Sequence, residues 1–155
     1  MSSKSLCFWV RCAIGMIAVC GLCVCAAWYP LGTSFSALVA SDLAAWCMLA
    51  FFWLTSLPCF FILVLSWKIS AAIKTGDFFT ARVAKLIKSS ALILFIDLGA
   101  FFIGNLVFAL LQVNVWALAY FFLTIAGLVT AIFMSVLSHY VAKAAELRDL
   151  NEGTI

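Results

Sequence analysis

The chain has 155 residues, of which 68% are hydrophobic and only 10% are charged, whereas an ordinary soluble domain is about 45–50% apolar and about 25% charged. Nine Lys and Arg with six Asp and Glu are too few charges to cover a globule of this size, and the mean hydropathy of +1.25 is typical of a chain surrounded by lipid. Composition therefore excludes a water-soluble fold.

Four apolar stretches follow one another along the chain. Each can supply a helix of about 20 residues, the length that crosses a hydrocarbon core of about 30 Å. We expect the spans near residues 12–29, 43–67, 90–111 and 115–140, with the turn between the last two at residues 112–114. The sequence predicts an all-α integral membrane protein, an up-down bundle of four transmembrane helices that forms a single domain over residues 1–155.

The first span is expected to remain as an uncleaved anchor, because its apolar stretch exceeds the usual core of a signal peptide. It is rich in sulfur: Cys12, Met16, Cys20 and Cys23 lie within about 80° of the helix surface at about 100° per residue. Such a stripe could hold Cu(I) or zinc, but no His lies nearby, and thiols in a lipid-spanning helix behave as small apolar groups. We therefore predict that these side chains pack, with no metal and no cofactor bound.

Residues 68–89, between the second and third spans, change to a basic amphipathic composition. We expect the second helix to extend, the chain to turn at Gly76, and a new helix to begin near Thr80, which can cap it, although Asp77 is a rival cap. The basic side chains can contact lipid headgroups or a protein partner; direct nucleic-acid binding is not expected. The candidate contact residues are Lys74, Arg82, Lys85 and Lys88.

The third span contains an isolated acidic residue, Asp97, about 13 Å deeper along the helix than Lys88. A carboxylate there costs about 2.5–3.5 kcal/mol on insertion scales. We therefore expect Asp97 to face other helices and to be uncharged, or nearly so, at pH 7. Pro58, which kinks the second span, and Thr130 lie at a similar depth. These three residues predict either a polar contact between helices or an ion or proton site.

The small residues Gly99, Ala100 and Gly104 are expected to let a neighbouring helix approach the third span. After the fourth span, the tail at residues 143–155 carries mixed charge. It is expected to continue the helix for a turn or two and to stop before Gly153.

All nine basic residues fall before the first span, between the second and third, or after the fourth. With an even number of spans these segments share one side of the membrane. The positive-inside rule then places both termini, the loop and the tail in the cytoplasm.

Residues 74–80, Lys-Thr-Gly-Asp-Phe-Phe-Thr, followed by Val83 and Leu86, resemble the cytoplasmic connection of the bacterial domain-of-unknown-function family 2975. Residues 145–155 resemble that family's tail. The resemblance implies a four-span protein of unknown activity in the bacterial inner membrane. It also implies a regulatory partner, since such proteins are often encoded beside a small helix-turn-helix regulator.

Paired carboxylates, a nucleophile with its base and a glycine-rich phosphate loop are all missing from the sequence, so we do not expect an enzyme or a catalytic residue. The leading hypothesis is a binding or regulatory protein that engages a cytosolic or membrane partner through its loop and tail. The alternative is a small transporter, or an ion or proton channel subunit, that uses Asp97 and assembles as a homo-oligomer.

Overall fold

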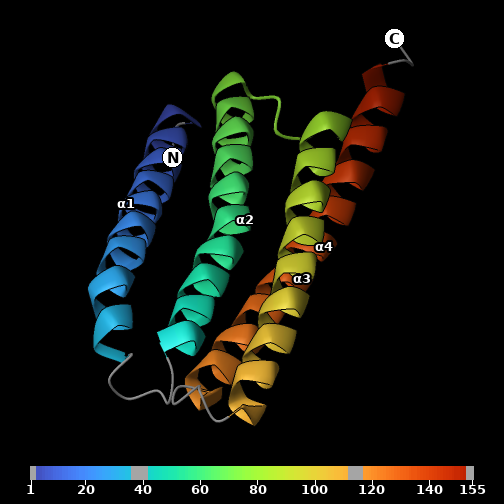
Figure 1. Ribbon diagram of the computed structural model, residues 1–155. Coiled ribbons are helices and arrows are strands. Elements are labelled where there is room, and N and C mark those ends of the chain that lie inside the picture. Colours follow the sequence, from blue (N-terminus) through green and yellow to red (C-terminus); the bar gives the residue numbers. More distant parts are fainter. Residues whose placement is uncertain (1–2, 36–41, 112–116, 153–155) are drawn as a thin grey trace.

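The computed structural model describes residues 3–35, 42–111 and 117–152. They form four α-helices: α1 (Ser3–Phe35), α2 (Asp42–Thr75), α3 (Ala81–Leu110) and α4 (Ala117–Glu152) (Figure 1). No strand occurs within these ranges. The all-α fold with four long helices is confirmed, while the turn predicted at residues 112–114 lies outside the described residues.

Every helix is longer than the span predicted for it. The shortest, α3, has 30 residues and is therefore about 45 Å long, whereas the hydrocarbon core is about 30 Å thick. Each helix is long and apolar enough to cross a membrane. The chain is thus a multi-pass membrane protein, and its helices extend past the hydrocarbon.

The helices alternate in direction, so the start of α1, the α2–α3 turn and the end of α4 lie at the same end of the molecule (Figure 1). We call this the basic end and define it as α1 up to Arg11, residues 68–88, and α4 from Ser138 onward. The prediction that these three segments share one side is confirmed. Which side of the membrane they face stays a prediction.

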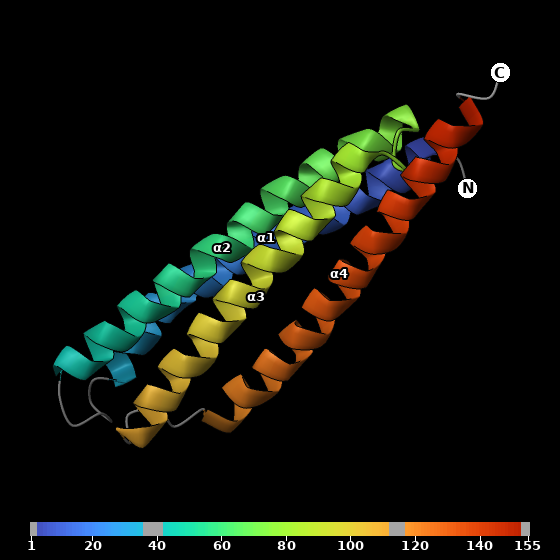
Figure 2. The same ribbon diagram turned by 90° about the vertical axis from the view of Figure 1, so that its right-hand side faces the viewer.

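The four helices form an open row. α1 packs on α2, α2 on α3, and α3 on α4 (Figures 1 and 2); among the described residues no other pair of helices is in contact. The outer helices α1 and α4 each have one helical neighbour, and no other described helix covers the rest of their surface.

The most tightly packed core lies at the basic end. It is centred on Val83, Ala84 and Ile87 of α3 and Val141 of α4, with Ile69, Ala72, Phe78 and Met134 packed around them. Water drives apolar side chains together where the helices leave the bilayer. Within the bilayer that driving force is missing, because lipid tails are as apolar as the side chains, and residues such as Leu54 and Ile103 point outward.

One face of α4 packs on α3 with a regular spacing. Ala131, Ser138, Val141 and Ala145 are buried, and Met134 packs on the core. The steps between these positions alternate between three and four residues, the heptad pattern of helices that pack side by side. Their mostly small side chains allow the two backbones to approach closely.

Close helix packing occurs at two glycines, of which one was predicted. A Cβ on Gly104 would collide with the ring of Phe51 on α2, and a Cβ on Gly127 would collide with Leu98 of α3. Nothing lies within 4 Å of a Cβ built on Gly99, and Ala100 is exposed. The prediction is confirmed at Gly104 and wrong at Gly99 and Ala100. For Gly99 the cause is geometric, since it lies about 140° around the helix from Gly104.

Candidate functional site

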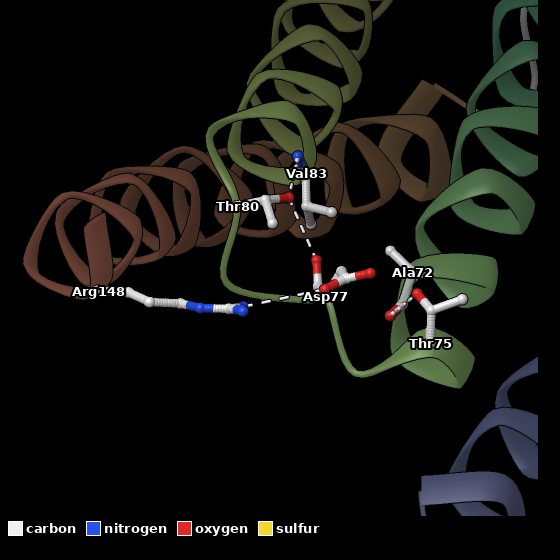
Figure 3. Close-up of polar contacts among 6 residues, drawn as sticks. All are labelled: Ala72, Thr75, Asp77, Thr80, Val83 and Arg148. Carbon is white, nitrogen blue, oxygen red and sulfur yellow. Dashed lines mark hydrogen bonds and ion pairs between the residues drawn. The ribbon is translucent and has the colours of Figure 1, made fainter. Parts of the chain in front are cut away.

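The basic end is organised by a hydrogen-bonded turn between α2 and α3 (Figure 3). The N–H of Gly76 donates to the carbonyl of Ile73 at 3.3 Å, and the N–H of Asp77 donates to the carbonyl of Ala72 at 3.0 Å. These two bonds form a Schellman cap, which places its glycine at positive φ; Gly76 has a φ of +80°. The predicted turn at Gly76 is confirmed.

Thr80 caps the start of α3. Its hydroxyl accepts a hydrogen bond from the N–H of Val83 at 3.4 Å and donates one to the carbonyl of Asp77 at 3.2 Å (Figure 3). Because the hydroxyl satisfies one of the free N–H groups at the helix start, it fixes where α3 begins. The prediction of Thr80 as the cap is confirmed, and the rival assignment to Asp77 is wrong.

The carboxylate of Asp77 instead reaches the tail. Its Oδ1 lies 3.9 Å from an Nη of Arg148 on α4, and the two side chains are 60% and 44% exposed (Figure 3). An ion pair so exposed contributes little stability. It does show that the turn and the end of α4 lie side by side, a contact that sequence reasoning missed.

The four predicted contact residues all lie on the surface of the basic end. Lys74 is in the last turn of α2, and the other three lie in the first two to three turns of α3; all four are exposed. Arg82, Lys85 and Lys88 cover an arc of about 120° on α3 that excludes the buried positions of the core. Their charges are therefore accessible to lipid phosphates or to an acidic partner.

A second cluster joins α1 to α2. The Nε of Arg11 donates to the hydroxyl of Ser70 at 3.0 Å, and the Sγ of Cys7 donates to the carbonyl of Ser70 at 3.3 Å. The guanidinium of Arg11 also lies 4.8 Å from the ring centroid of Trp67, a favourable cation–π geometry. Sequence reasoning missed this cluster, because its partners are 59 and 63 residues apart.

The contacts between antiparallel helices place Lys68 and Lys88 at one level, and we expect this level to be one boundary of the hydrocarbon. Cys59 faces Asp97 and Phe51 faces Gly104, so Lys68 and Lys88 lie at one level. From Lys88 to Leu110, the last residue of α3, the helix rises about 33 Å, which matches the hydrocarbon thickness of about 30 Å. With Lys88 and Leu110 at the two boundaries, we expect the residues beyond Lys88 on the basic side to lie in the headgroup layer or in water.

The end of α4 projects furthest on this side. Leu98 faces Gly127 and Val141 packs in the core with Val83 and Ala84, so Lys88 is level with residue 137. Leu150 is then about 20 Å beyond that level. The headgroup layer is only about 5–7 Å thick on each side, so we expect the end of α4 to stand in water.

Within the membrane, Asp97 faces α2. The Sγ of Cys59 donates to its Oδ2 at 3.8 Å, and Cys59 directly follows Pro58. Thr130 is exposed and its hydroxyl donates to the carbonyl of Ala126 in its own helix. The structure thus brings Asp97 to Cys59, the residue after Pro58, and leaves Thr130 apart. Both roles expected for Asp97, a polar contact between helices and an ion or proton site, stay predictions.

The sulfur stripe of α1 faces outward. Cys12, Cys20 and Cys23 are exposed, and Met16 is 65% exposed, whereas Cys7 is buried against α2. The stripe does not contact α2, because it lies on the face of α1 opposite this helical neighbour, and the packing role of its side chains stays a prediction.

A family model described as "Protein of unknown function (DUF2975)" matches residues 33–155. The match contains α2, α3 and α4 with the hydrogen-bonded turn at residues 74–80. No curated protein and no solved structure has significant similarity to the chain.

Proposed function

We propose, for a chain that belongs to the DUF2975 family of proteins of unknown function, that it is a membrane-embedded binding or regulatory protein with no catalytic activity, which engages a protein partner through its basic end. In this proposal the basic end faces the cytoplasm of a bacterial cell, as the distribution of basic residues favours. A small helix-turn-helix regulator is the partner that the family resemblance suggests.

The projection of the basic end past the lipid headgroups supports this proposal above all. Lipid phosphates are sufficient partners for a lysine at the level of Lys88. They do not account for a hydrogen-bonded turn and a helix end that continue about 10–20 Å beyond the level of Lys88, with Lys74 and Arg82 exposed beside them.

Charge reversal on α3 tests the proposal. In the triple variant Arg82→Glu, Lys85→Glu, Lys88→Glu, we expect the protein that co-purifies with the wild-type chain from native membranes to be lost, because the charges facing it have changed sign. The measurement is quantitative mass spectrometry of the purified complex after mild cross-linking.

The matched control keeps the charges and changes the side chains: Arg82→Lys, Lys85→Arg, Lys88→Arg should retain the partner. Equal recovery of the same partner with the reversed and the control variants would exclude docking through these residues.

A second candidate function, transport of an ion or proton by a homo-oligomer, is favoured by the contact of Asp97 with Cys59 beside Pro58. A carboxyl group next to a break in helix hydrogen bonding is how some transporters build an ion site. The variant Asp97→Asn keeps the shape of the side chain and removes its titration. If the chain moves protons, flux into proteoliposomes should stop in this variant; flux that is unchanged across pH rejects the candidate.

A further inference from the structure

The outward face of α4 continues as a regular seam past the membrane. Tyr140, Lys143, Leu147 and Leu150 are spaced by three, four and three residues, so they fall within about 80° of the helix surface. That arc is opposite the face that packs on α3 through Val141 and Ala145. We call these four residues the outer seam.

The two leucines of the outer seam lie beyond the level that lipid tails are expected to reach. Leu147 and Leu150 are 62% and 64% exposed and lie about 15 and 20 Å beyond the level of Lys88. Lipid tails do not reach that height. Leucines repeated on one face of a helix in water are typical of a surface that another protein covers.

The charge on the seam argues against a second copy of this chain as the occupant. Two copies in one membrane share an orientation, so their α4 helices would run parallel and Lys143 would face its own counterpart. The positions flanking the seam, Glu146 and Asn151, supply no pair of opposite charges across such a dimer. A lysine at a seam position that meets its own counterpart selects against self-association and favours a partner with an acidic residue.

We propose that the outer seam binds an amphipathic helix of another protein, whose leucine-type residues pack on Leu147 and Leu150 and whose acidic residue faces Lys143. This inference rests on the proposed function, because it names the chemistry of the partner at the projecting basic end. It concerns α4, whereas the charge-reversal test above concerns α3.

The test uses the full chain in nanodiscs and two synthetic helical peptides of three heptads with leucine seams. The peptides are identical except for one central seam residue, Glu in one and Lys in the other. By fluorescence anisotropy the Glu peptide should bind the wild-type chain at least about tenfold more tightly than the Lys peptide. In the variant Lys143→Glu this preference should reverse. The double variant Leu147→Ser, Leu150→Ser should bind neither peptide, and Asp149→Asn, off the seam, should behave as the wild type.

Three outcomes would overturn the inference. The first is equal binding, or no binding, of the two peptides to the wild-type chain. The second is a wild-type dimer cross-linked through Leu150→Cys, which would identify a second copy as the occupant; such a dimer is expected only once Lys143→Leu removes the like charges. The third is quenching of Leu147→Trp by brominated lipid, which would place the seam on the bilayer.

The two proposals fail separately. Loss of the native partner in the α3 charge-reversal variant, together with peptides that do not discriminate, would retain the proposed function and reject the outer seam. If the peptides discriminate but the native partner is still recovered with the charge-reversal variant, the outer seam is retained and docking through the α3 surface is rejected.

Discussion

At Gly76 the backbone takes a left-handed conformation in open space. Its φ is +80°, and nothing lies within 4 Å of where a Cβ would stand. A side chain at this position is therefore disfavoured by the backbone conformation and not by contact with neighbouring atoms. Gly76 and Thr80 could both be predicted from the sequence, because the caps they form depend on residues within five positions of each other. The contact of Arg11 with Ser70 could not, since no local pattern marks its partner.

Gly76→Ala should lower the free energy of unfolding by about 1 kcal/mol, the cost of the left-handed conformation for a residue with a Cβ. The measurement is an SDS titration followed by far-UV circular dichroism. Gly15→Ala is the control, because Gly15 is within α1 with equally open space around it. Alanine is the better helix former there, so that variant should be unchanged or slightly more stable.

Among the elements, the existence of each helix was predictable and the face that it buries was not. A soluble helix reveals its inner face by an apolar stripe, whereas the spans here are apolar all round. Gly99 and Gly104 look equivalent in such a sequence, and only one of them meets α2. Gly127, which meets Leu98, was missed for the same reason.

Gly104→Ala should destabilise the α2–α3 contact by roughly 1–3 kcal/mol, the usual range for forcing extra volume into a packed site. In the same SDS titration, Gly99→Ala on the same helix should cost nothing. Replacing the opposing ring, in the double variant Gly104→Ala, Phe51→Leu, should recover part of the loss. A Gly104→Ala protein as stable as the Gly99→Ala protein would contradict the close approach of Phe51.

At the scale of the whole molecule, the open row makes the attachment of α1 depend on α2 alone. Composition and charge placement predicted the number of helices and their alternation. They could not predict a row rather than a closed ring, because that difference depends on which apolar faces meet. The polar part of the α1 attachment is concentrated at Ser70, which is fully buried and contacts both Arg11 and Cys7.

Ser70→Ala should loosen the end of α1, because Arg11 loses its hydroxyl acceptor. In a background in which Cys7 is the one remaining cysteine, we expect maleimide to label Cys7 several-fold faster in this variant, since the thiol is now only 4% exposed. Ser66→Ala is the control, because Ser66 bonds to the carbonyl of Ile62 in its own helix. Equal labelling rates in the two variants would count against the Ser70 attachment.

The position of the core also sets an order of events during synthesis. Val83, Ala84 and Ile87 emerge from the ribosome long before Val141, which completes their packing. Until the fourth helix has been inserted, Ile69, Ala72 and Phe78 can pack on these side chains, but the face that Val141 covers in the complete fold stays open. A nascent or truncated chain that ends before Val141 therefore displays an apolar patch of the kind that quality-control proteases and chaperones select, and the last helix to be made conceals it.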